Sequence, residues 1–146
     1  MTETIEDTDA VDLLDALVQL SFAVTAVLTK AAARHDLSLT QLRMLGVLRG
    51  REPKMAELAA FLGLDRSTVS GLIDRAERRG LARRTGSPDD GRSVRVSLTP
   101  AANRLAVDLV AEIGRSLAPM IDRLAQNDRR RLTALLARLL GPLPAA

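Results

Sequence analysis

The chain has 146 residues, of which 47% are apolar and 27% charged, as is typical of one soluble domain with a buried core. The lack of cysteine excludes disulfides, thiolate metal sites and thiol redox sensing, and with a single histidine we predict no metal site and no cofactor. The net charge of +3 is uneven: residues 1–15 carry six acidic and no basic side chains, whereas residues 43–95 carry twelve basic against seven acidic ones. A basic middle favours a polyanionic partner, although a solvated charged surface has the same composition.

The start of the chain predicts no targeting segment. Its first ten residues, MTETIEDTDA, are acidic and polar, whereas a secretory signal needs a basic start followed by an apolar stretch. We find no run of about 18 apolar residues and therefore expect no membrane span. These features predict a cytoplasmic protein.

The first half of the chain predicts four helices from apolar residues at helical spacing, over residues 9–34, 40–49, 54–62 and 66–79. In the first, Leu14, Leu17, Val24 and Leu28 belong to a broad apolar stripe. Thr40 is the expected cap of the second helix.

The pattern then changes to a strand period. Val94, Val96 and Leu98 alternate with polar residues, 81–85 is a plausible partner strand, and the segment between them is rich in turn residues, so residues 81–98 predict a β-hairpin.

Two further helices follow the hairpin. Thr99 and Pro100 start a helix that Pro119 should kink or interrupt, and a last helix runs from about residue 128 to 140.

The predicted fold is mainly α with a small β-hairpin, in the order α-α-α-α-β-β-α-α. We group residues 37–99 into a middle domain, and assign residues 1–36 and 100–146 to a helical dimerisation region. The first helix and the last two carry more apolar surface than the small middle domain can cover, which indicates burial across a subunit interface. A monomeric helical bundle is the alternative.

A helix-turn-helix motif fits residues 57–73. Ala59 is small enough for two helices to touch, Gly63 tolerates positive φ in the turn, and Asp65 can cap the second helix. Apolar residues of the second helix are spaced to pack on the first; they are Val69, Leu72, Ile73 and Ala76. The alternative is an ordinary helical hairpin with a solvated outer face.

The other face of the second helix carries cations and hydroxyls. Because a helix fits the major groove with its N-terminal residues at the base edges, the base-reading candidates are Arg66, Ser67, Thr68 and Ser70. Arg75 and Lys54 are further DNA-binding candidates.

A hairpin directly after a recognition helix is a wing, so we assign residues 37–99 to a winged helix-turn-helix DNA-binding domain. Arg92, at its tip, is a candidate for entering the minor groove, and Arg83, Arg84 and Arg95 are candidates for phosphate contacts. The tip is otherwise a polar turn, and for Asp89 we prefer that interpretation.

Three segments, LTQLRMLGVL, ELAAFLGLDRSTVSGLIDRAERRGLARR and DDGRSVRVSLTPAANRL, resemble the MarR family of multiple-antibiotic-resistance-type regulators. The resemblance covers about residues 10 to 141. It implies a triangular homodimer whose terminal helices form the dimer region and whose winged domains read an inverted-repeat operator. It also implies repression of the protein's own or neighbouring genes, with release by a small phenolic or anionic ligand.

The chain departs from the family pattern at several places. Ala102 stands where glycine is common, and Ala125 where Ser or Thr often caps the last helix, so that Asn127 is the substitute cap. The lack of cysteine and the single histidine argue against the peroxide-sensing and zinc-sensing branches.

A small aromatic or anionic effector would lie among the first, second and fifth helices, with Phe22, His35, Met44 and Arg49 as candidate contacts. A regulator without a ligand is the alternative.

Two other classes of function were considered. The sequence shows neither a Ser/His/Asp pattern nor a phosphate-binding loop, and we predict that the protein is not an enzyme. A winged-helix adaptor that binds proteins and not DNA is the other alternative, and the arginine-rich second helix disfavours it.

Overall fold

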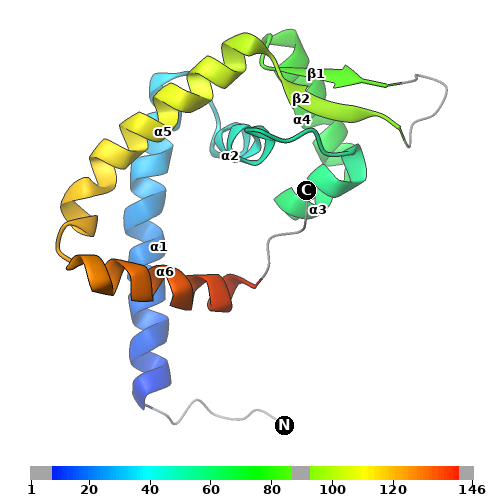
Figure 1. The fold of residues 1–146 in the computed structure, drawn as a ribbon. Helices are drawn as coiled ribbons and strands as arrows, with labels where there is room; N and C mark the ends of the chain where they lie inside the picture. The colour runs from blue at the N-terminus through cyan, green and yellow to red at the C-terminus, as the bar shows by residue number, and fades with distance from the viewer. Residues whose placement is uncertain (1–7, 87–92, 142–146) are drawn as a thin grey trace, which may run out of the picture.

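The computed structural model describes residues 8–86 and 93–141 (Figure 1). Its elements in chain order are α1 (Thr8–Arg34), α2 (Leu39–Leu48), α3 (Met55–Leu62), α4 (Arg66–Arg78), β1 (Ala82–Thr85), β2 (Arg95–Leu98), α5 (Pro100–Ile121) and α6 (Gln126–Leu140). This order confirms the predicted mainly α fold with one hairpin.

The cap predicted for α2 is wrong by two residues. Ser38 is the N-cap: the Gln41 amide donates to Ser38 Oγ at 3.1 Å, and the Ser38 amide donates to Gln41 Oε1 at 2.9 Å. This reciprocal pair is a capping box, which needs Gln or Glu three residues after the cap. Thr40, followed three residues later by Arg43, cannot form one.

The C-terminal helices also differ from expectation. Helix α5 continues through Pro119 and ends at Ile121, so the proline does not interrupt it. Close to a helix end, proline removes a single backbone hydrogen bond. Helix α6 begins at Gln126 after Ala125, whose side chain offers no cap, and the prediction that Asn127 caps this helix is wrong because Asn127 lies inside its first turn.

One apolar core joins α2 to the helix-turn-helix, the hairpin and the start of α5. Its fully buried large side chains are Met44, Leu45, Leu48, Leu58, Val69, Ile73, Val96 and Leu109. Ala31 and Ala32, near the end of α1, extend this core toward the long helices. Burial of each large aliphatic side chain contributes about 1.5–3 kcal/mol.

The hairpin is tied to the helical body at both of its ends. Its antiparallel register pairs Ala82 with Leu98 and Thr85 with Arg95. The Val96 amide donates to the Pro53 carbonyl at 2.9 Å, and Thr99 Oγ1 donates to the Gly80 carbonyl at 2.6 Å. The hairpin therefore lies in a defined position beside α3 and α4.

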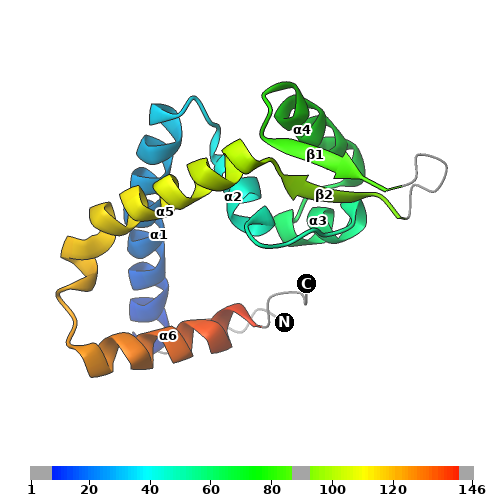
Figure 2. The same cartoon turned by 45° about the horizontal axis from the view of Figure 1, so that its top comes forward.

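The long helices extend away from this winged domain. Figures 1 and 2 both show α5 leading back from the hairpin and α6 turning sharply at its far end. In the single chain no residue of α6 is buried. Large apolar side chains that stay exposed on these helices include Val11, Leu13, Leu14, Val18, Phe22, Val110, Ile121, Leu132, Leu135 and Leu139.

The apolar character of α1 corrects one sequence expectation. Within Thr8–Arg34 an 18-residue window has a mean hydropathy of 1.8, so by length and composition this helix could cross a membrane. Polar residues such as Gln19 and Thr25 interrupt the apolar run, so the criterion of an unbroken apolar run excludes this helix. They lower its mean hydropathy only slightly. None of the window is buried within the chain, so its apolar surface must be shielded from water by another molecule.

Gly63 provides a test of the turn between α3 and α4. Its φ of +65° lies in the left-handed region, and an added Cβ there would meet no neighbouring atom within 4 Å. We expect Gly63→Ala to lower the free energy of unfolding by about 1–2 kcal/mol, through backbone strain alone. Gly46→Ala is the matched control, because Gly46 is helical with equal space around it, and it should stabilise by about 0.5–1 kcal/mol. Urea unfolding at one protein concentration measures both, and equal effects would contradict the strain argument.

Candidate nucleic-acid interface

The helix-turn-helix is held by backbone and side-chain bonds around Gly63. The Leu64 amide donates to the Ala59 carbonyl at 3.1 Å, and Ala59 itself is buried against α4. From α2, Arg43 donates to the carbonyls of Phe61 at 3.1 Å and Leu62 at 3.0 Å. A cation at a helix C-terminus satisfies free carbonyls and opposes the helix dipole. Arg43 therefore fixes the first helix of the motif to α2, a role that sequence reasoning missed.

Helix α4 is strongly two-sided. Val69, Leu72, Ile73 and Ala76 are buried, as predicted from their spacing. Arg66, Ser67, Thr68 and Arg75 are exposed on the other side, and Ser70 is half-buried. The structure thus brings four of these five DNA-binding candidates to one solvent-facing side of the helix.

Asp65 organises the first turn of α4. Its carboxylate accepts from the Thr68 amide at 2.7 Å, from Ser67 Oγ at 2.7 Å and from Thr68 Oγ1 at 2.9 Å. The bond from the Thr68 amide, followed by those from the Ser67 and Thr68 hydroxyls, lowers the pKa of Asp65 to about 2. The predicted cap is confirmed, and it holds two base-reading candidates besides the backbone.

Arg84 is engaged with α4. Its guanidinium pairs with Asp74 at 2.8 Å and with Glu77, and it approaches the Ser70 carbonyl at 3.4 Å. These contacts hold the first strand of the hairpin against the recognition helix. A phosphate contact by Arg84 would have to compete with both carboxylates.

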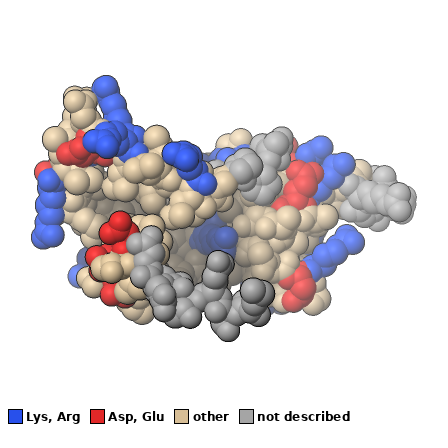
Figure 3. All heavy atoms as spheres, turned by 90° about the horizontal axis from the view of Figure 1, so that it is seen from below, with Lys and Arg blue, Asp and Glu red and all other residues tan. Residues whose placement is uncertain are grey.

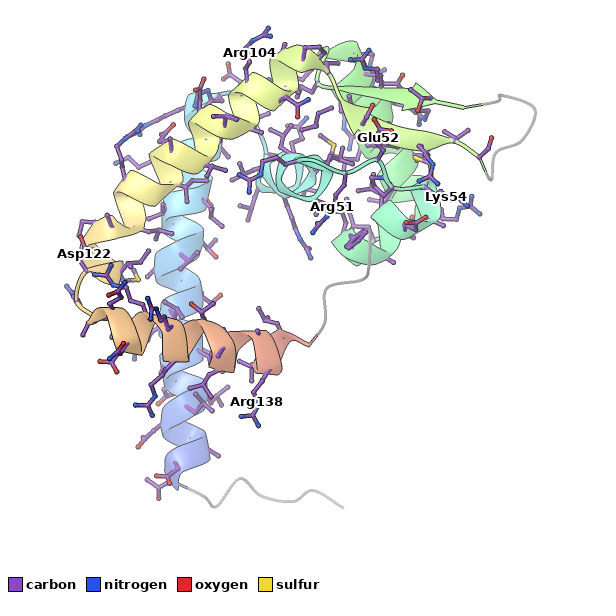
Figure 4. The ribbon with its side chains drawn as sticks, viewed as in Figure 1. Arg51, Glu52, Lys54, Arg104, Asp122 and Arg138 are labelled. Carbon is purple, nitrogen blue, oxygen red and sulfur yellow. The ribbon has the colours of Figure 1, made fainter. Side chains whose placement is uncertain are left out.

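The other cationic candidates have different surroundings. Arg83 is exposed on β1, and Arg95 donates to the Glu52 carbonyl at 2.9 Å. Lys54 precedes α3, and its backbone forms an isolated antiparallel β-bridge with that of Arg95. Figure 4 shows Lys54 near the hairpin. Arg92 lies outside the described residues.

A groove separates the start of α4 from the hairpin. It has a volume of about 400 Å³ and is lined by Met55, Arg66, Ser67, Ser70, Arg84 and Val94. Three of the candidates on α4, Arg66, Ser67 and Ser70, therefore line one groove together with residues of the hairpin.

A second, mostly apolar pocket of about 550 Å³ lies among α1, α2 and α5. Its lining includes Leu28, Leu42, Val47, Leu109 and Ile113, with cationic Arg43, Arg49 and Arg51. Seen from below, the molecule is hollowed, and basic atoms are visible in the hollow (Figure 3). Arg51 also lies over the Phe61 ring, 5.6 Å from its centroid.

Of the four residues predicted for an effector, only Arg49 lines this pocket. Met44 is fully buried in the core and does not line the pocket. Phe22 is 72% exposed on α1, far from the pocket-lining part of that helix.

His35, the fourth, contacts another element. Its Nε2 lies 3.1 Å from Glu112 Oε2 on α5, and Arg34 pairs with the same carboxylate at 2.5 Å. The Arg34 hydrogen bond, and then that from His35, lower the pKa of Glu112. The end of α1 is thus tied to α5.

The joint between the long helices and the winged domain, residues 35–38, is also tied to α4. Arg79, at the end of α4, donates to the Asp36 carbonyl at 2.6 Å and to the His35 carbonyl at 3.4 Å. Asp36 has a φ of +54°, an uncommon conformation for a residue other than glycine. These long-range contacts link the end of α4 to the residues that follow α1.

Comparisons with known proteins agree on one family. The family model described as "MarR family" matches residues 35–93. The HTH-type transcriptional regulator PecS of Dickeya dadantii is 26% identical over 137 residues, covering 91% of this chain and 82% of PecS. The uncharacterized HTH-type transcriptional regulator YfiV of Bacillus subtilis is 35% identical over 71 residues, and this match spans 48% of the chain but only 44% of YfiV.

Among solved structures, CouR from Rhodococcus jostii RHA1 bound to p-coumaroyl-CoA superposes with a TM-score of 0.76. The superposition covers 99% of this chain and 100% of CouR, with 24% sequence identity. At that identity the likeness shows the fold alone.

The lowered pKa of Asp65 predicts an acid-dependent loss of stability. A carboxylate whose pKa is depressed on folding stabilises the protein above its ordinary pKa, and this contribution disappears as the pH falls from about 4 to about 2. Asp65→Asn keeps a cap but cannot titrate. The difference in urea midpoint between wild type and Asp65→Asn should therefore be largest above pH 4 and shrink toward pH 2. A difference that stays constant over this range would contradict the assignment.

Proposed function

We propose that the chain, whose residues 35–93 match the MarR family model, is a transcriptional regulator of that family that binds an inverted-repeat operator in double-stranded DNA as a homodimer and represses transcription. The exposed first turn of α4 carries the proposal: Arg66, Ser67 and Thr68 face solvent beside a basic groove. A helix enters the major groove with such residues at the base edges. Residues 37–99 are then the DNA-binding domain.

The uncovered long helices support assembly of two chains. Helix α6 buries none of its residues in the single chain, although Leu132, Leu135 and Leu139 form an apolar stripe along it. Exposed apolar side chains on the first half of α1 add to this surface. A second copy is the cover we propose, with residues 1–36 and 100–146 as the dimerisation region. This interface also accounts for the apolar surface of α1 without a membrane.

Two-fold symmetry determines how such a dimer meets DNA. Two copies of α4 about 34–36 Å apart would enter successive major grooves. Arg75, Arg83, Arg95 and Lys54 are the proposed phosphate contacts, and Arg92 of the wing remains a proposal from sequence. Phosphate contacts supply affinity and register, whereas the first turn of α4 supplies sequence choice.

The pocket among α1, α2 and α5 supports release by a small molecule. Its apolar walls suit an aromatic or aliphatic body, and Arg49 and Arg51 offer cations to an anionic end. CouR, which shares the fold, was solved with p-coumaroyl-CoA bound. A ligand there would lower DNA affinity only by favouring one spacing of the two recognition helices over another.

DNA binding is tested by fluorescence anisotropy with duplexes from the DNA upstream of the chain's own gene. Wild-type affinity should fall as salt rises, and Arg75→Ala should weaken binding to all sequences and lower the salt slope by about 1 per subunit. Lys30→Ala removes an equal charge from exposed α1 and should leave the slope unchanged. Equal effects of the two variants would contradict the interface, and a wild type that binds no duplex would favour the protein-binding adaptor.

The same experiment tests the role of assembly. Leu135→Glu places a charge in the apolar stripe of α6, so it should yield single subunits in analytical ultracentrifugation and weaken operator binding by at least about 100-fold, because only one half-site is then held. Arg138→Glu changes charge on the same helix without touching the stripe and should remain dimeric. Dimers of Leu135→Glu with unchanged affinity would refute this interface.

Effector binding is tested with p-coumarate and p-coumaroyl-CoA. An accepted compound should raise the melting temperature and release the operator. Double replacement of Arg49 and Arg51 by Gln should weaken binding about tenfold or more, since a charge-assisted hydrogen bond is worth about 1.5–3 kcal/mol. Arg104→Gln is the control, because Arg104 projects from the start of α5 away from the pocket (Figure 4). No response to these or to a wider panel of aromatic acids would favour a regulator without a ligand.

A further inference from the structure

The Asp65 cap has a chemical consequence for the two hydroxyls that it holds. Ser67 Oγ lies 2.7 Å from Asp65 Oδ1, and Thr68 Oγ1 lies 2.9 Å from Oδ2. All three residues are exposed, so the hydroxyl oxygens remain open to solvent on their other side. The two contacts use different oxygens of the one carboxylate.

A carboxylate has no hydrogen to donate, so in both contacts the hydroxyl must be the donor. Each hydroxyl has a single hydrogen, and that hydrogen is used in the bond to Asp65. What Ser67 and Thr68 present outward is then lone pairs only. The low pKa of Asp65, about 2, keeps the carboxylate ionised at neutral pH.

The neighbouring candidates on α4 have the opposite character. Ser70 Oγ accepts from Arg84 Nη2 at 3.5 Å, which leaves its own hydrogen free for an outward acceptor. The guanidinium of Arg66 can only donate. The first turns of α4 therefore carry a fixed pattern of donors and acceptors, with two acceptors in the middle.

We propose that Asp65 makes Ser67 and Thr68 obligate hydrogen-bond acceptors, and that they read amino groups of adenine or cytosine in the major groove. The inference rests on the proposed function, because it assumes that α4 enters that groove. Adenine N6 and cytosine N4 are the only amino donors that base pairs present there, whereas guanine O6 and thymine O4 are acceptors.

A transition mutation is the sharpest probe of this rule. Changing adenine to guanine, or cytosine to thymine, replaces an amino donor by a carbonyl oxygen at nearly the same place in the groove. The carbonyl oxygen and the hydroxyl oxygen are then both acceptors, so their lone pairs repel and no hydrogen bond forms between them. Each such transition should lower affinity at least about fivefold, the lower end of what one mismatched base pair costs.

Asp65→Asn separates the two hydroxyls. Its amide oxygen can replace Oδ1, which accepts from Ser67 and from the Thr68 amide, and its NH₂ group then replaces Oδ2 and donates to Thr68 Oγ1. The Thr68 hydrogen becomes free to point outward, whereas Ser67 stays an acceptor. The variant should therefore change base preference at one position and leave the other as an internal control.

The experiment begins with selection of duplexes from a random pool by the full chain. Single transitions are then scanned in the selected half-site with wild type, Ser67→Ala, Thr68→Val and Asp65→Asn. The readout is the ratio of affinities for each base pair exchange, since loss of a negative charge in Asp65→Asn should raise affinity for every duplex. Asp108→Asn, which removes an exposed carboxylate from α5, is the matched charge control.

The expected result is a base-pair preference at two positions, one lost in Ser67→Ala and the other in Thr68→Val. Asp65→Asn should then reduce the transition cost at the Thr68 position at least about threefold and leave the Ser67 position unchanged, while Asp108→Asn changes neither. An unchanged Thr68 position in Asp65→Asn, or hydroxyl variants without effect on base preference, would each overturn the inference. A wild type that selects no duplex would refute the proposed function itself, a failure distinct from these.

Discussion

Burial of one face of α4 is the constraint on which the rest of the site depends. Val69, Leu72 and Ile73 are almost completely removed from solvent, and rotation of the helix would expose them at a cost of several kcal/mol in total. The opposite side is therefore fixed toward solvent. Arg84 from the hairpin and Arg79 at the helix end add polar contacts that hold the same orientation. The hydroxyl and guanidinium surface is thus presented by packing and needs no ligand to form.

The joint after α1 connects this rigid domain to the long helices. Arg79 binds the carbonyls of residues 35 and 36, while the His35 side chain contacts Glu112 on α5. The pocket among α1, α2 and α5 lies next to this joint, and Arg43 in its lining also holds the end of α3. A molecule in the pocket would therefore contact Arg43, which positions the end of α3, together with residues of α1 and α5.

Much of this fold could be predicted from the sequence, because periodicity and turn chemistry are local. Gly63 and Asp65 lie where the motif needs them, and the hairpin follows from alternation alone. The long-range contacts could not be predicted: Arg84 reaches Asp74 and Glu77 only because the hairpin folds back on α4. Met44 was misplaced for a similar reason, since the face of α2 that lines the pocket is decided by how α2 docks, not by its own pattern. A search for Ser-x-x-Gln would have located the cap at Ser38.

The exposure of α6 in a single chain has a consequence for its stability. None of its residues is buried, and such segments open readily and are cut by proteases. If two chains pair as proposed, folding and pairing become one equilibrium, so the folded fraction rises with the concentration of the chain.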